Sequence, residues 1–300
     1  MLDAPPAGLS IVVAGGGCKT FWGMGLLRSI ADLLPPIERW AGTSAGAIMS
    51  LVQVADRVDE SLAHFLEATR NNPRNFYPRH VLGDQPVFPH EGIARAALRH
   101  VFADGGFARI VDGPPVHILQ SYIAPGQSAL RTSLAAYRDF DRRNRVGRLH
   151  GPTRPPSGLG VQVVRSTDAA DAEQLLTWVL MSSTAPPVTR MLRDGGRRYL
   201  DGALVDNVPV RALPEHARTG RILVLLSAPE KVARRPLRLP EGGQILYLGP
   251  ADYPPARTWD YTSPERIMAT YELGQREGLV LRGRVEALLA EPLATPGSPW

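Results

Sequence analysis

Two short apolar runs near the start of the chain, Leu9–Ala14 and Ile37–Ala41, each lead into a glycine turn and then into a helical pattern. Their length and their β-branched residues predict buried strands. Helical apolar spacing follows over Gly25–Leu34 and Ala47–Val58. Strand, glycine turn and helix, repeated in this order, predict a parallel α/β core, because a helix is the usual connection between parallel strands.

The rest of the chain continues this alternation, apart from two irregular segments. Asn71–His90 mixes prolines with aromatic residues and predicts a cap or loop over a site, whereas the arginine-rich segment Arg138–Gly160 predicts a mobile loop. Asp194-Gly195-Gly196 predicts a hairpin. Further strands are expected at Val116–Ile123, Val161–Arg165, Arg221–Ser227 and Gln244–Leu248, and further helices at Glu91–Phe102, Ala170–Ser182 and Pro264–Ala290.

Composition places the chain among ordinary globular proteins, with 44% hydrophobic and 21% charged residues. It has no run of eighteen apolar residues, so no transmembrane helix is expected. Met1–Pro6 lacks the basic region of a secretory signal, and Cys18, as the single cysteine, excludes an internal disulfide. We therefore expect a cytoplasmic protein.

The formal net charge of +5 comes almost entirely from arginine and is spread along the chain. So modest an excess argues against nucleic-acid binding. In Arg138–Gly160 a solvated loop is favoured, and the alternative is a patch that touches anionic lipid head groups at a membrane surface. The sequence contains no signal of oligomeric state.

The second glycine turn contains a candidate nucleophile, Ser44, in the segment Gly42-Thr43-Ser44-Ala45-Gly46. In a G-x-S-x-G turn the serine lies on a strained bend between strand and helix, and the glycines remove side chains that would clash. The helix N-terminus that follows offers amide donors to an anion beside the serine oxygen. A glycine-flanked N-cap serine without a catalytic role has the same pattern. The turn alone leaves both interpretations open.

The first glycine turn, Gly15-Gly16-Gly17-Cys18-Lys19, has consecutive backbone amides that can bind an oxyanion. A dinucleotide-binding turn is the alternative, but it needs a glycine at the position of Thr20 and an acidic residue at the end of the second strand, whereas Glu38 lies at its start. A phosphate-binding loop would need Gly-Lys-Ser/Thr after the glycines. We therefore expect an oxyanion hole here.

A serine nucleophile needs a base, usually a histidine held by a carboxylate. The candidate carboxylate is Asp201, in Asp201-Gly202-Ala203, and His216, the single histidine that follows it, lies in a polar stretch that predicts exposure. A dyad of Ser44 and Asp201 therefore remains, in which the carboxylate accepts the serine proton directly. None of the six preceding histidines has a neighbourhood that suggests a base: His64, His80, His90, His100, His117 and His150.

These segments together resemble the patatin-like phospholipases. The loop from Gly15 to Lys19 is similar to the oxyanion loop of that family, and the turn around Ser44 is similar to its nucleophile elbow. Met181–Pro186 resembles the small-residue stretch ahead of the catalytic aspartate. The block from Asp201 to Pro209, with Asn207 in its trailing Asn-x-Pro, matches the D-G-[GA] block. The matching order extends over about residues 9–229, which makes it far more specific than any one motif.

The resemblance implies a three-layer α/β/α patatin-like fold with a mostly parallel sheet. It implies a single domain over residues 1–300, in which residues 230–300 form a C-terminal strand and helix extension. It also implies hydrolysis of phospholipid or related lipid esters without metal or cofactor, with Ser44 and Asp201 catalytic. The expected oxyanion residues are Gly15, Gly16, Gly17 and Cys18; Gly42, Ala45 and Gly46 shape the elbow; Lys19, Gly202 and Asn207 support the site.

One position departs from the family pattern. Thr20 stands where the oxyanion loop usually has glycine, and a threonine at positive φ would be strained. Lys19 lies where the family has Arg or Lys, and its expected structural role is an ion pair that fixes the loop. The aromatic segment Asn71–His90 is our candidate for the wall that receives an acyl chain.

Two other classes of protein are consistent with parts of the sequence. A lipid-binding or regulatory protein could keep this fold without turnover, although competent residues occupy both dyad positions. A dinucleotide-binding oxidoreductase would bind nicotinamide or flavin at the first glycine turn.

Overall fold

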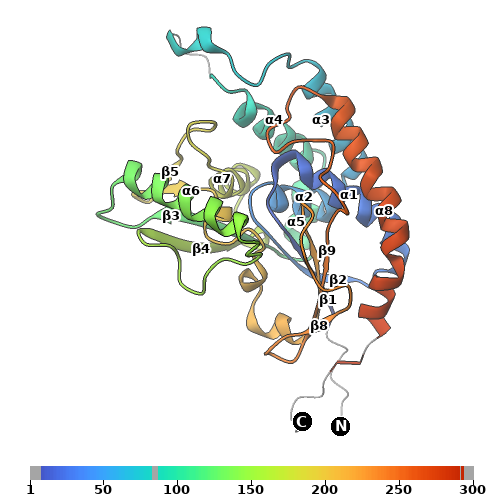
Figure 1. Ribbon diagram of the computed structural model, residues 1–300. Coiled ribbons are helices and arrows are strands. Elements are labelled where there is room, and N and C mark those ends of the chain that lie inside the picture. Colours follow the sequence, from blue (N-terminus) through green and yellow to red (C-terminus); the bar gives the residue numbers. More distant parts are fainter. Residues whose placement is uncertain (1–7, 83–86, 291, 294–300) are drawn as a thin grey trace.

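The computed structural model describes residues 8–82, 87–290 and 292–293. Over this part of the chain it forms a nine-stranded, mostly parallel sheet flanked by helices, as the sequence predicts (Figure 1). Met1–Pro6 lies outside the described residues, so the absence of a secretory signal stays a prediction. The parallel strands are β1 (Leu9–Val13), β2 (Ile37–Gly42), β3 (Val116–Ile123), β7 (Arg221–Leu225) and β9 (Gln244–Leu248). The antiparallel ones are β4 (Leu159–Arg165), β5 (Arg193–Asp194), β6 (Arg197–Leu200) and β8 (Leu237–Arg238).

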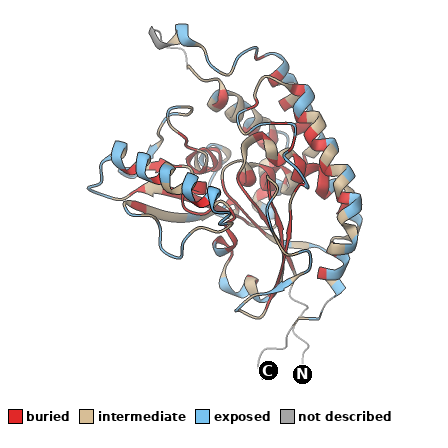
Figure 2. Ribbon diagram, viewed as in Figure 1, coloured by how far each residue is buried: buried red, intermediate tan, exposed pale blue. Residues whose placement is uncertain are grey.

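The central strands are buried on both faces (Figure 2). In β1, Ile11 and Val13 belong to the larger core cluster, while Val12 belongs to a second cluster on the opposite face. Burial on both sides explains the continuous apolar run of this strand.

Helices cover the face of the larger cluster, and shorter segments cover the other face. The helices on the larger cluster are α1 (Phe21–Ile30), α2 (Ala45–Val54), α3 (Val58–Arg70), α4 (His90–Phe102), α5 (Gly106–Asp112), α7 (Ala172–Ser182) and α8 (Pro264–Ala290). The opposite side holds α6 (Ala129–Arg145) and the 3₁₀ turns η5 (Gly202–Leu204), η6 (Val210–Ala212) and η7 (Glu215–Thr219). The remaining 3₁₀ turns are η1 (Gly17–Thr20), η2 (Ala31–Leu33), η3 (Pro78–Leu82) and η4 (Ser166–Asp168). No helix in the described ranges combines the length and apolar character needed to cross a bilayer.

Two different strands share one edge of β3. Along its other edge, β4 pairs with almost the whole of β3, so β2 and β6 must both lie on the remaining edge. There β2 runs parallel to the first half of β3 and ends at Gly42, opposite Ile118. From the other end, β6 runs antiparallel to the second half and ends at Leu200, opposite Ser121. The two strand ends approach each other, and the residues that follow them meet in the gap.

The mobile loop predicted over 138–160 is wrong for its first part, because α6 continues to Arg145. The arginines are compatible with a helix, since arginine is a good helix former. Arg143 is buried, is paired with Asp139 at 2.9 Å and donates to the carbonyl oxygen of Leu204. It therefore anchors the helix and is not exposed to solvent on a loop. The segment without helix or strand is limited to residues 146–158.

Helices α1 and α8 pack with their backbones in direct contact. A Cβ atom at Gly25 would collide with the carbonyl oxygen of Tyr271, and one at Gly274 would collide with that of Trp22. The Trp22 indole also donates to the Glu277 carboxylate at 2.6 Å. These contacts attach the C-terminal helix to the helix that follows the glycine loop.

We predict that Gly274→Ala lowers the free energy of unfolding by about 1–3 kcal/mol, because the added methyl group has no room between the helices. The matched control is Gly283→Ala on the same helix, where a Cβ would meet nothing within 4 Å. That change should raise stability by about 0.5–1 kcal/mol through helix propensity. Urea unfolding followed by circular dichroism measures both, and an equal gain in the two variants would contradict the close approach.

Candidate active site

Ser44 lies on a strained turn between β2 and α2, with φ 53° and ψ −131°. The flanking glycines leave room for this bend. A Cβ atom at Gly46 would lie 2.7 Å from the carbonyl oxygen of Ala14, and one at Gly42 would lie 2.6 Å from the amide nitrogen of Ala47. Strain of this kind persists only where the surrounding structure imposes it. The turn thus places the Ser44 side chain at the N-terminus of α2.

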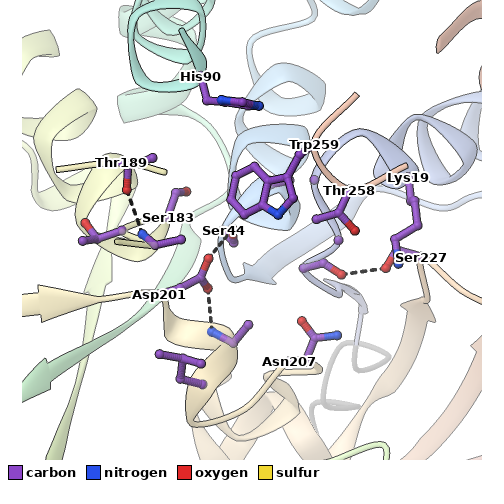
Figure 3. A pocket seen from close by; sticks show the side chains of 18 of the residues that line it. Lys19, Ser44, His90, Ser183, Thr189, Asp201, Asn207, Ser227, Thr258 and Trp259 are labelled. Carbon is purple, nitrogen blue, oxygen red and sulfur yellow. Dashed lines mark hydrogen bonds between the residues drawn. The ribbon is translucent and has the colours of Figure 1, made fainter. Parts of the chain in front are cut away.

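The Ser44 hydroxyl points at the carboxylate of Asp201 (Figure 3). Its Oγ donates to Asp201 Oδ2 at 2.8 Å, within hydrogen-bonding reach. The other carboxylate oxygen, Oδ1, accepts from the backbone amide of Ala203 at 2.8 Å. Both oxygens are therefore fixed, and one of them faces the serine.

Burial raises the pKa of Asp201 from its ordinary value of 3.8 to about 6, while the hydrogen bonds from Ala203 and Ser44 act in the opposite direction. The carboxylate is thus ionised at neutral pH, yet it holds a proton more readily than an exposed aspartate. A pKa near the working pH is what a general base requires.

A set of buried hydroxyls fills the gap between β2 and β6. Ser182 donates to the carbonyl oxygen of Leu119 at 2.6 Å and accepts from the Ser44 amide at 2.9 Å. Ser121 donates to the carbonyl oxygen of Asp201 at 3.0 Å. A Cβ atom at Gly202 would collide with the Leu119 carbonyl, so glycine is needed there as well. These groups orient the two strand ends that bear the serine and the aspartate.

The glycine loop is held at both ends by backbone hydrogen bonds. The Gly15 amide donates to the carbonyl oxygen of Asn207, and the Cys18 amide donates to that of Thr258, both at 3.1 Å. Two of the four expected oxyanion donors are therefore already engaged. The amides of Gly16 and Gly17 have no such acceptor among the described residues, and both glycines line the pocket beside Ser44.

Gly17, rather than residue 20, has the positive φ of this loop, at 58°. Thr20 has φ −67°, in the helical region, and its hydroxyl donates to the Gly17 carbonyl at 2.8 Å. The strain that a threonine would suffer at positive φ does not arise. Lys19 forms no ion pair with the described residues. Burial lowers its pKa, and the charge of Glu230 opposes that effect.

Ser44 and Asp201 open into a pocket of about 480 Å³. Its walls include Tyr137 and Phe140 from α6. Trp259, from the segment before α8, forms another part of the wall (Figure 3). Of the described part of Asn71–His90, His90 alone lines the pocket, so that segment does not build the expected acyl-chain wall. Sequence patterns did not point to Trp259 or Thr258, because they lie more than 200 residues from the serine and belong to no motif.

A smaller cavity of about 70 Å³ adjoins the pocket and shares five lining residues with it: Gly17, Ala45, Ile48, Ala94 and Tyr261. Its other lining residues are mostly apolar and come from η1, α1, α2, α3 and α4, among them Phe21, Met24, Met49, Val52, Phe65, Ala97 and Val101. No three His, Cys, Asp or Glu side chains in the described ranges gather so that they could hold a metal ion.

Similarity to known proteins identifies the family to which this chain belongs. The family model for patatin-like phospholipase matches residues 11–214. The chain belongs to this family. Among solved structures, the crystal structure of VipD from Legionella pneumophila resembles the chain at 11% identity and a TM-score of 0.48, covering 93% of this chain and 67% of that one. No curated protein matches.

Membership in the patatin-like phospholipase family supports lipid acyl hydrolase activity on lipid esters. Both segments that meet in the pocket, the serine turn and the aspartate block, lie inside the matched range. The Thr258–Tyr261 segment lies outside the matched range. This segment accepts a hydrogen bond from the glycine loop and forms one wall of the pocket.

We predict that the difference in unfolding free energy between Asp201→Asn and the wild type is more favourable to the variant above pH 6 than below pH 4. A raised native pKa means that the native carboxyl binds more protons than the unfolded one between pH 3.8 and about 6. Wild-type stability therefore falls as pH rises through that window, by up to about 3 kcal/mol. Asparagine does not titrate; its Oδ1 can accept from the Ala203 amide, and its Nδ2 can donate to Ser44 Oγ, which reverses the direction of that bond. Urea unfolding of both proteins from pH 3 to 8 tests this, and a difference independent of pH would refute it.

Proposed function

We propose that this patatin-like protein hydrolyses lipid acyl esters through a Ser44–Asp201 dyad and an acyl-enzyme intermediate. The supporting observation is the 2.8 Å hydrogen bond from Ser44 to a half-buried carboxylate whose pKa is raised to about 6. A carboxylate with this pKa can take the serine proton directly at neutral pH. His216, the alternative base in a triad, is exposed on η7.

In the first step, Ser44 Oγ attacks the ester carbonyl carbon while Asp201 Oδ2 accepts its proton. The tetrahedral intermediate then collapses, the carbon–oxygen bond of the alcohol breaks, and the same proton passes from Asp201 to the leaving oxygen. In the second step, water attacks the acyl-enzyme and gives a proton to Asp201. The acid leaves, and the proton returns to Ser44.

The oxyanion in both steps would bind the amides of Gly16 and Gly17, together with the Ala45 amide at the start of α2. Each preorganised donor of this kind contributes about 3 kcal/mol to transition-state stabilisation. Gly15 and Cys18 would support the hole by fixing the loop between Asn207 and Thr258. The positive end of the α2 dipole favours the same negative charge.

We predict that Ser44→Ala and Asp201→Asn each lower kcat by at least about 10³-fold on a p-nitrophenyl ester. For the wild type, kcat/KM should fall about tenfold per pH unit below pH 6 and level off above it, because only the ionised carboxylate can act as the base. His216→Ala is the control and should keep the wild-type rate. A comparable loss in that variant would favour a triad over the dyad.

A fluorophosphonate probe distinguishes the enzyme from a lipid-binding protein of the same fold. We expect the probe to label the wild type and to leave Ser44→Ala unlabelled, because the label requires an activated serine oxygen. A folded wild-type protein that takes no label would support binding without turnover.

The small apolar cavity beside Ser44 would receive the end of the acyl chain. We predict that Ala97→Phe, which fills it, lowers kcat/KM for octanoyl relative to butanoyl esters by about tenfold, since burial of two methylene groups would be lost. Ala96→Phe, at the exposed neighbouring position of α4, is the matched control. An unchanged chain-length preference in Ala97→Phe would place the acyl chain elsewhere.

A further inference from the structure

The outer face of α6 exposes large apolar side chains beside arginines. Leu130 and Leu134, one turn apart, are 78% and 47% exposed, and Val146, directly after the helix, is 64% exposed. Arg131, Arg138, Arg142 and Arg145 are exposed on the same helix. Contiguous exposed leucines are uncommon on a protein surface without a partner.

The spacing of these residues places them next to the catalytic pocket. Residues 130, 134, 138, 141 and 145 follow one another at intervals of three or four and form one stripe along the helix. Tyr137, Phe140 and Asn144, which line the pocket, form the adjoining stripe, and Asp141 of the exposed stripe also reaches the pocket lining. The exposed stripe of α6 thus begins where the pocket wall ends.

Two exposed aromatic side chains lie on another side of the same pocket. Tyr253 is 71% and Trp259 is 39% exposed, and both line the pocket. A residue that lines a pocket and is also exposed lies at its mouth. Tryptophan and tyrosine are the residues that favour the boundary between water and lipid head groups.

The charges on α6 indicate the sign of the charge that a binding partner should carry. Arg142 is paired with Asp139, whereas Arg138 and Arg145 have no ion pair with the described residues. These two arginines line a depression on the outer side of the helix together with Arg142, Val146 and Asp141, so three guanidinium groups there outnumber one carboxylate. Such a surface favours phosphate-bearing, negatively charged groups.

We infer that α6, with Leu130, Leu134, Arg138 and Arg145, docks the protein on an anionic lipid bilayer, with Tyr253 and Trp259 at the same interface, so that the pocket mouth faces the membrane. This inference rests on the proposed lipid acyl hydrolase function, because a substrate in the bilayer gives the mouth its orientation. A helix with leucines beside arginines has the composition of an interfacial helix, which buries its apolar side chains at the head-group boundary.

The test is co-sedimentation of the wild type with vesicles of ether-linked lipids, which the enzyme cannot hydrolyse. One set contains phosphatidylcholine alone and the other adds phosphatidylglycerol. We expect tighter binding to the second set. Arg138→Gln/Arg145→Gln should weaken that binding about 30-fold and remove the preference, since each basic residue near an anionic surface contributes about a fivefold factor. Leu130→Ser/Leu134→Ser should weaken binding to both sets.

Matched controls lie on other surfaces. Leu279→Ser/Val280→Ser removes two exposed apolar side chains from α8, on the opposite side of the molecule (Figure 1). Arg234→Gln/Arg235→Gln removes two exposed charges from the segment before β8. Both double variants should bind vesicles as the wild type does. Equal weakening by the controls, or no binding of the wild type to phosphatidylglycerol vesicles, would overturn the inference.

Two further measurements separate the possible failures. Hydrolysis of a soluble p-nitrophenyl ester should be unchanged in the α6 variants; if the wild type hydrolyses that ester but ignores anionic vesicles, the docking inference alone is wrong. If the vesicles are bound and no ester is cleaved, the proposed activity fails instead. A wild-type dimer in sedimentation velocity that dissociates in Leu130→Ser/Leu134→Ser would assign this face to a second copy of the chain and overturn the inference.

Discussion

The site depends on a break in strand pairing along one edge of β3. Where β2 has ended and β6 has not yet begun, the carbonyl oxygen of Leu119 accepts the Ser182 hydroxyl instead of a neighbouring strand. The same hydroxyl accepts the Ser44 amide, so a single side chain both satisfies a buried backbone group and fixes the nucleophile turn. A continuous strand at this edge would leave no space for the serine and the aspartate to meet.

Features that are unfavourable by themselves are concentrated in this gap. Ser44 has a strained backbone, and Asp201 loses hydration when it is ionised. Both persist because the sheet and α2 fix the backbone on either side of the turn, and the lack of room for a Cβ at Gly42 and Gly46 shows how closely that turn is packed. These features lower the stability of the site locally, and the apolar burial in the two core clusters on either face of the sheet offsets that cost.

Local patterns in the sequence were enough to predict the central strands, the serine turn and the glycine loop, because each is encoded within about ten neighbouring residues. The helical state of 138–145 was missed, since arginines among glycines and prolines resemble a loop until Arg143 is seen buried against Leu204. The hydroxyl network and the contact of Cys18 with Thr258 join residues 63 to 240 positions apart, and no local pattern encodes such pairs. Thr20 shows the converse: a departure from the motif proved harmless because positive φ occurs at Gly17.

The residues that define the family and the residues that shape the pocket come from different parts of the chain. The matched range, 11–214, contains the serine, the aspartate and the glycine loop, whereas Thr258 and Trp259 lie beyond it. Their position depends on α8, which the glycine contacts bind tightly to α1, the helix directly after the glycine loop. The C-terminal segment is therefore coupled to the glycine loop through packing, and changes in that segment would alter the pocket while leaving Ser44 and Asp201 in place. Under the proposed function, the family motifs supply the residues that cleave the ester bond, and α6 together with the segment before α8 would control which substrate reaches them.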